Sequence, residues 1–267
     1  MSSESSAGAP HPFHMVTPSP WPAVGALAAF VTAFGAVTWF HDRAQPWVLM
    51  AGVALVLVTM AGWWAEVLRE GRSGGAHTGP VRHGLRVGMA LFIASEVMFF
   101  VAFFWAFFNA ALKVNPSVMQ WPPQGIEPLH TWGLPFVNTL ILLSSGLAVT
   151  WAHHGLKKGN RTVLKAGLAV ALVLGVVFLT LQAVEYGEAA FGFTEGVYPT
   201  VFYMATGFHG FHVLVGACFL AVCLGRALKG GFTPSQHVGF EAAAWYWHFV
   251  DVVWIFLFVW VYWWGNA

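Results

Sequence analysis

Residues 85–112 read LRVGMALFIASEVMFFVAFFWAFFNAAL, and the only charged side chains in this stretch are those of Arg86 and Glu96. An α-helix of about 20 apolar residues spans the hydrocarbon core of a bilayer, so the stretch predicts a transmembrane helix. Six further apolar runs of similar length occupy about 22–40, 46–68, 132–153, 163–186, 198–226 and 240–264. The sequence therefore predicts an all-α, polytopic membrane protein with seven transmembrane helices.

The composition supports this prediction. Hydrophobic residues make up 58% of the 267 residues and charged residues only 9%, whereas a soluble domain carries about 25% charged residues. Most of the surface must therefore face lipid. The net charge of +1 argues against nucleic acid as a partner. The two cysteines, Cys218 and Cys223, lie in one apolar run on different helix faces, and we expect neither a disulfide nor a metal site from them.

The apolar runs and the basic residues together predict the organisation of the chain. Residues 1–21 form an N-terminal tail and lead-in, 22–68 the first two transmembrane helices, 69–84 a loop, and 85–267 a bundle of five helices. Of the 12 Lys and Arg residues, all but Arg43 and Lys113 flank loops on one side of the membrane. The positive-inside rule places that side, with the N-terminus, in the cytoplasm, and the C-terminus on the periplasmic side.

Ionisable side chains inside hydrocarbon are costly and deserve a functional hypothesis. Glu96 lies 11 residues into its predicted helix, about 16 Å along it at the usual rise per residue. One hypothesis is a carboxylate that exchanges protons or senses lipid. The alternative is a protonated acid that is hydrogen-bonded to a neighbouring helix and has a structural role.

Two further polar pairs fall at membrane depth. His209 and His212 have a spacing that could place both rings on one metal or haem, but histidines at such positions more often bond across helices. His248 precedes Asp251 by three residues on the same helix face, a pattern that suits either catalysis or a pair that locks helices together. We favour the structural interpretation for both. The chain has no C-x-x-C-H haem attachment motif, P-loop or copper-ligand cluster, which predicts that any catalysis belongs to a partner subunit.

Several segments resemble cytochrome c oxidase subunit III of the aa3-type haem–copper oxidases, in order from about residue 11 to the C-terminus. They are HPFHMVTPSPWP (11–22), WWAEVLREG (63–71), HGLRVGMALFIASEVMFFVAFFWAFF (83–108), WPPQGI (121–126), LLSSGLAVTWAHH (142–154), ATGFHGFHVLVG (205–216) and GFEAAAWYWHFVDVVWIFLFVWVYWW (239–264). The resemblance implies two N-terminal helices separated from a five-helix bundle by a V-shaped, lipid-filled cleft.

The resemblance also implies a function. It predicts a non-redox core subunit of cytochrome c oxidase, which reduces O2 to water with electrons from cytochrome c and pumps protons. Haem a, haem a3 and copper are expected in partner subunits, and this chain is expected to bind phospholipid and to contact subunit I directly. It would support assembly and stability of subunit I, proton uptake, and O2 entry through bound lipids. The alternative is a stand-alone channel or transporter that uses Glu96.

Residue roles follow from the matched motifs. Glu96 corresponds to the family's buried carboxylate near the cleft. From their depth in the predicted helices, we also expect His209, His248 and Asp251 to form a mid-membrane polar network. The lipid-binding positions implied by the match are Trp64, Glu70, His77, Phe92, His212, Arg226, Lys229 and His237. At Ala65 the sequence departs from the basic residue expected in the family, which puts one local charge pairing in doubt. The Ala-, Gly- and Val-rich spans favour a bacterial inner membrane, with the mitochondrial inner membrane expected for a eukaryotic chain.

Overall fold

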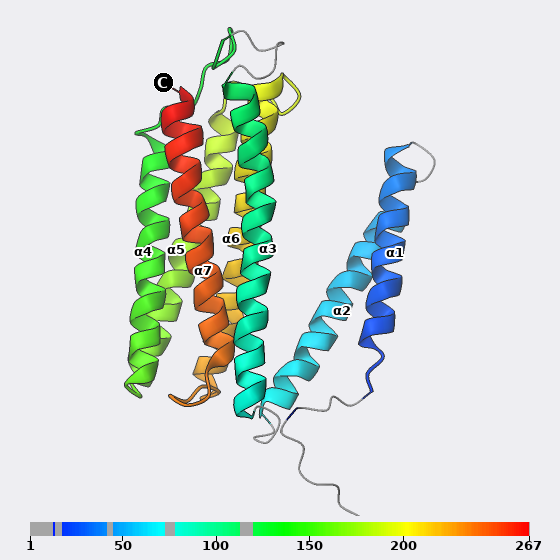
Figure 1. Cartoon of the computed structure of the whole chain (residues 1–267), viewed down its shortest axis with the longest axis vertical. Helices are drawn as coiled ribbons and strands as arrows, with labels where there is room; N and C mark the ends of the chain where they lie inside the picture. The colour runs from blue at the N-terminus through cyan, green and yellow to red at the C-terminus, as the bar shows by residue number, and fades with distance from the viewer. Residues whose placement is uncertain (1–12, 14–17, 42–44, 73–77, 113–119, 267) are drawn as a thin grey trace, which may run out of the picture. The chain divides into compact units, whose positions relative to one another are not determined.

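A computed structural model describes residues 13, 18–41, 45–72, 78–112 and 120–266. In these residues seven helices are long and apolar enough to cross a membrane, which confirms the all-α prediction and its seven spans (Figure 1). The helices are α1 (Trp21–Phe40), α2 (Trp47–Arg72), α3 (Gly79–Ala111), α4 (Leu134–Lys157), α5 (Arg161–Glu188), α6 (Val197–Leu228) and α7 (Val238–Leu257).

Some helices extend beyond the predicted apolar runs. α2 continues to Arg72, and α3 begins at Gly79, six residues before the start of the predicted run, so the connection between them is shorter than 69–84. A run of apolar residues marks only the part of a helix that lies in the hydrocarbon core. The backbone hydrogen bonds of the helix can continue through polar residues at the interface.

The chain forms two compact units, Met1–Gly84 and Leu85–Ala267. In the first unit α1 and α2 pack along each other with their backbones in close approach. A Cβ atom added at Gly35 would lie 2.5 Å from the backbone nitrogen of Leu49, and one at Gly52 would lie 2.6 Å from that of Thr32. Small residues allow transmembrane helices to approach in this way. Before α1 begins, Ser19 Oγ donates a hydrogen bond of 2.6 Å to Glu66 Oε2 on α2.

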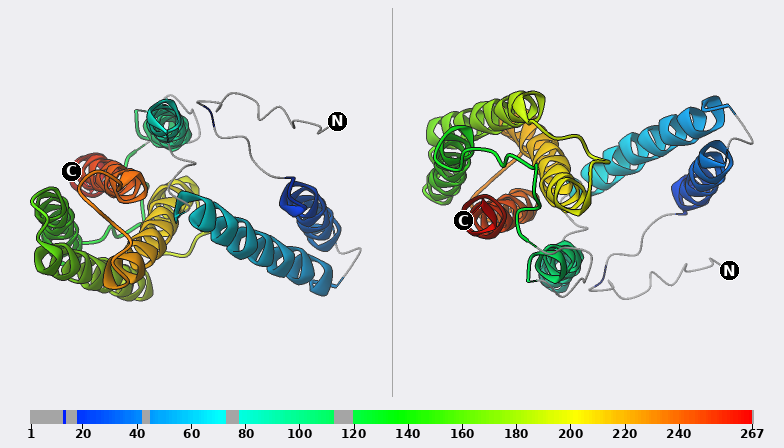
Figure 2. Two further views of the ribbon diagram at one scale, coloured as in Figure 1. Left: turned by 90° about the horizontal axis from the view of Figure 1, so that it is seen from below. Right: turned by 90° about the horizontal axis from the view of Figure 1, so that it is seen from above.

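In the second unit α4, α5, α6 and α7 contact one another in sequence, and α4 also contacts α7. Figure 2 shows α7 between α3 and α4 in both end-on views. α3 joins this bundle through aromatic side chains. Phe99 on α3 contacts Phe208 on α6, and Phe104 on α3 contacts Phe256 on α7, with ring centroids 5.2 Å and 6.0 Å apart. The long aromatic run of α3 thus becomes a packing surface.

The end of α7 is not a regular α-helix. Residues Phe258–Trp263 form a π-helix, and Trp264–Asn266 form a turn of 3-10 helix. The backbone carbonyl of Tyr262 accepts a hydrogen bond of 2.5 Å from Thr131 Oγ1. Asn266 Nδ2 donates to the carbonyl of Leu129 at 2.8 Å. These bonds tie the end of the chain to the segment that leads into α4.

Candidate functional site

Glu96 on α3 and His212 on α6 form a close pair at membrane depth. Glu96 Oε2 lies 2.9 Å from His212 Nε2, while His212 Nδ1 lies 2.6 Å from the backbone carbonyl of Phe208. Because a carbonyl only accepts, Nδ1 carries a proton. The short contact at Nε2 then needs one further proton, either on Nε2 or on the carboxyl of Glu96. The contact is therefore suited to a proton shared between the imidazole and the carboxyl.

Aromatic rings surround the imidazole of His212. Ring centroids lie 5.8 Å away for Phe99, 4.9 Å for Phe100, 6.4 Å for Tyr246 and 6.4 Å for Phe249. These rings come from α3 and α7, so all three helices contribute to the site. An apolar shell lowers the local dielectric constant and strengthens the hydrogen bond that it encloses.

His209 has different partners from His212. It is completely buried, and its Nε2 donates to the backbone carbonyl of Val250 at 3.2 Å. Its ring packs against that of Trp254, with the ring centroids 5.0 Å apart. The two histidines therefore serve separate contacts between α6 and its neighbours. Among the residues that the structure describes, no group of three or more His, Cys, Asp or Glu side chains is arranged to hold a metal ion.

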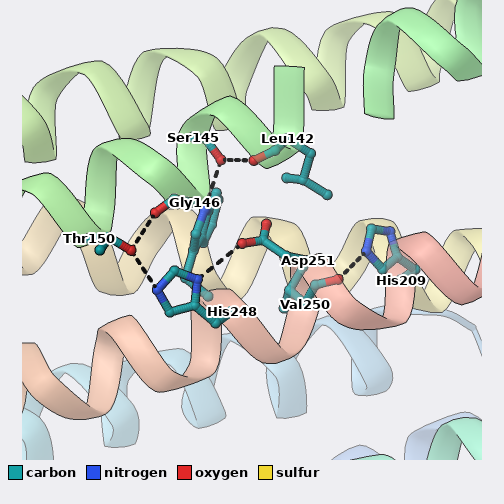
Figure 3. Close-up of polar contacts among 9 residues, drawn as sticks. Leu142, Ser145, Gly146, Thr150, His209, His248, Val250 and Asp251 are labelled. Atoms are coloured by element: carbon teal, nitrogen blue, oxygen red, sulfur yellow. Dashed lines mark hydrogen bonds and ion pairs between the residues drawn. The ribbon is translucent and has the colours of Figure 1, made fainter. Parts of the chain in front are cut away.

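His248 and Asp251 lie together on α7 and face α4 (Figure 3). His248 Nδ1 is 3.3 Å from Asp251 Oδ2, and His248 Nε2 is 3.2 Å from Thr150 Oγ1 on α4. Thr150 Oγ1 in turn donates to the backbone carbonyl of Gly146 at 3.1 Å. The pair thus links two helices of the bundle, and it is separate from the Glu96–His212 pair.

A third polar cluster was not singled out in the sequence. Tyr262 in the π-helix donates from its hydroxyl to Glu185 Oε1 at 2.6 Å, and Gln182 Nε2 donates to the same oxygen at 3.1 Å. All three side chains are buried. Glu185 falls at the end of the predicted run 163–186, where a charged residue is expected simply to mark the end of the transmembrane span. The signal that could have revealed it is Gln182 three residues earlier, on the same face of α5.

The predicted lipid-binding residues are distributed over both units. Trp64 lines a groove of about 480 Å³ on the α1–α2 pair, together with apolar side chains such as Met60 and Val67. Phe92 on α3 is half-exposed, and its ring stacks on Tyr246 at 6.3 Å. Glu70 lies in the last turns of α2, and His77 falls outside the described residues.

The basic candidates lie near one end of the second unit. The guanidinium of Arg226 lies over the ring of Phe232 at 4.4 Å, and Lys229 follows the last residue of α6. His237 directly precedes α7, and its ring centroid is 5.5 Å from that of His153. Nearby, Arg86 on α3 pairs with Glu241 on α7 at 2.9 Å.

Comparison with known proteins places these features in a family. The sequence profile of the family described as cytochrome c oxidase subunit III matches residues 11–266. The chain belongs to the cytochrome c oxidase subunit III family. It is 54% identical over 257 residues to cytochrome c oxidase subunit 3 of Scyliorhinus canicula, covering 96% of this chain and 98% of the relative. The subunits 3 of Branchiostoma lanceolatum and Dugong dugon are each 52% identical with the same coverage.

Family membership decides several of the sequence predictions. The resemblance to subunit III is confirmed. The chain is a multi-pass membrane protein of the respiratory chain and a subunit of the cytochrome c oxidase complex. The predicted bacterial origin finds no support in these relatives, which come from animals.

Proposed function

We propose that this chain is the non-redox subunit that stabilises subunit I of cytochrome c oxidase and supports proton uptake, while lipids bound to it assist O2 entry. The complex would reduce O2 to water with electrons from cytochrome c and pump protons, with haem a, haem a3 and copper held by partner subunits. The observation that carries the proposal is the Glu96–His212 pair, which lies at membrane depth and has a contact short enough to share a proton. Such a pair is suited to an auxiliary role in proton handling.

The pair favours a proton-handling role for a chemical reason. Its proton can reside on either His212 or Glu96 without a change in the heavy-atom contact of 2.9 Å. Buried carboxyl and imidazole groups in membranes often serve as proton relays. A stand-alone channel built on Glu96 is the alternative. Helices broken near the membrane midplane would favour it, yet Glu96 and His212 lie in the continuous helices α3 and α6.

The groove on α1 and α2 supports the lipid-binding part of the proposal. Its lining is apolar, and it includes the indole rings of Trp63 and Trp64. Acyl chains pack against such surfaces, and Trp side chains prefer the interface between hydrocarbon and water. Arg226 and Lys229, on the basic side of the second unit, would contact lipid phosphates there. The V-shaped cleft stays a prediction of the family resemblance.

The membrane is inferred from the relatives. We infer an inner membrane that carries a respiratory chain, with the N-terminus and the basic loops on its cytoplasmic or matrix side. Because the animal relatives are encoded in mitochondria, they favour the mitochondrial inner membrane over the bacterial one that composition alone suggested.

The decisive experiment compares the oxidase with and without this chain. The depleted enzyme is expected to begin O2 reduction at a rate similar to that of the intact enzyme and then to lose activity during turnover. An oxidase carrying Glu96→Gln should show slower proton uptake than the wild type and still retain the chain. If the depleted enzyme has no initial activity at all, the auxiliary role is wrong.

Lipid binding is tested separately by native mass spectrometry of the intact complex. Trp64→Ala should reduce the number of retained phospholipids, because the indole is part of the groove. Trp47→Ala is the matched control: it is an exposed Trp on the same helix that does not line the groove. Unchanged lipid retention in Trp64→Ala would count against the groove as a lipid site.

A further inference from the structure

One ionisable side chain at membrane depth is only partly covered by the residues that the structure describes. His248 lies ten residues after the first residue of α7, about 15 Å along the helix. The helical segment that contains it continues to Asn266. The ring therefore lies within the hydrocarbon thickness, and 44% of the side chain is exposed.

The other deep ionisable side chains described above are covered much better. The exposed fraction of the side chain is 22% for Glu96, 8% for His212 and 9% for Asp251. His209 and Glu185 are fully buried. Ionisable side chains in transmembrane segments almost always face the interior of a bundle or a polar cavity. His248 departs from this rule when the chain is considered by itself.

The ring of His248 cannot turn away from this exposed position. Its two nitrogens are held by Asp251 Oδ2 at 3.3 Å and by Thr150 Oγ1 at 3.2 Å (Figure 3). Long Lys and Arg side chains escape hydrocarbon by extending to the interface. A histidine side chain is too short to do so from this depth. The bundle thus fixes a polar ring on its outer surface.

The residues beside His248 form a continuous strip. Trp245, Val252 and Ile255 on α7 are exposed and share its helix face, at separations of three, four and seven residues. We call Trp245, His248, Val252 and Ile255 the α7 strip. A ridge with this spacing is the kind of surface that interdigitates with a second helix.

We propose that the α7 strip is the surface on which a transmembrane helix of another oxidase subunit packs, with a polar side chain of that helix against His248. Acyl chains offer no hydrogen-bonding group at this depth, and lipid headgroups lie at the interface, so a protein helix is the occupant that the chemistry favours. Polar side chains commonly hydrogen-bond between membrane helices. The inference rests on the proposed role of the chain within the oxidase and adds the face that makes the contact.

Photo-crosslinking in the intact oxidase tests the surface directly. A photoreactive residue in place of Val252 should crosslink to another subunit. The same residue in place of Val173, which is exposed on α5 at a similar distance from the helix start, should give a much weaker crosslink or none. A crosslink from 252 only to lipid, to a second copy of this chain, or to another helix of this chain would overturn the proposal.

A pair of variants tests the contribution of His248. In His248→Leu the share of chain that remains with the oxidase during detergent purification should fall several-fold, whereas in His248→Asn, which keeps a polar side chain, it should fall less. Asp251→Asn is the control, because it alters the same bond within the bundle but substitutes no residue of the α7 strip. If Asp251→Asn reduces retention as much as His248→Leu, weakening of the bundle explains the loss and the proposal is wrong.

Discussion

Glu96 Oε2 and His212 Nε2 lie 2.9 Å apart although the two residues are separated by 116 positions in the chain. The contact joins α3 to α6 inside a shell of aromatic rings. It is accompanied by a hydrogen bond from His212 Nδ1 to the backbone of its own helix. A single bond network thus keeps a proton on Nδ1 of the histidine and holds the carboxyl in position.

A double-mutant cycle measures the strength of this contact. Glu96→Leu and His212→Leu should each destabilise the chain, and the coupling energy between them should be about 1 kcal/mol, the usual range for hydrogen bonds between membrane helices. Reversible SDS titration of the purified chain in mixed micelles provides the free energies. Additive effects of the two substitutions would mean that the contact contributes nothing to stability.

The close approach of α1 and α2 gives a second prediction. Gly35→Ala places a methyl group within 2.5–2.9 Å of the backbone of Val48 and Leu49, and no side-chain movement relieves this overlap. Overpacking of this kind should destabilise the chain by about 1–3 kcal/mol in the same titration.

Gly88→Ala is the matched control for that substitution. Gly88 lies in α3, and a Cβ atom there would meet nothing within 4 Å. Alanine favours a helix over glycine, so this variant should be neutral or more stable by about 0.5–1 kcal/mol. Equal losses in the two variants would show that the backbone contact at Gly35 is unimportant.

The sequence predicted the spans and the local polar pair but not the pairing between helices. Seven helices follow from apolar length alone, and the His248–Asp251 contact follows from a separation of three residues. The partner of Glu96 depends on how α3 is rotated about its axis. Because α3 is apolar on nearly every face, its sequence does not define that rotation.

The cluster at Glu185 could not be predicted for a different reason. Tyr262 reaches Glu185 from the π-helix Phe258–Trp263. A π turn adds a residue to the helix and rotates every later side chain away from its α-helical position. The α-helical period therefore does not apply beyond Leu257, and the direction of the Tyr262 side chain does not follow from it.

The Tyr262–Glu185 bond gives a third prediction. Tyr262→Phe removes a buried donor and leaves Gln182 as the remaining hydrogen-bond partner of the carboxyl in this cluster. The variant should be less stable by about 1–3 kcal/mol, the cost of leaving a buried polar group under-satisfied. Tyr203→Phe is the control, because the hydroxyl of Tyr203 donates to the backbone of Phe191 in a less buried position. Similar losses in both variants would contradict a special role for the buried cluster.

The start of α5 supplies the last prediction. Asn160 precedes the helix, and its Oδ1 accepts hydrogen bonds of 3.1 Å from the backbone nitrogens of Thr162 and Val163. Asn160→Ala removes the acceptor and exposes two helix-terminal donors, so the free energy of unfolding should fall by about 1 kcal/mol. Asn160→Asp keeps the acceptor and adds a negative charge near the positive end of the helix dipole, so it should retain stability. If both substitutions have the same effect in the SDS titration, the cap does not stabilise α5, and the contacts of α5 with α4 and α6 hold the helix in place without it.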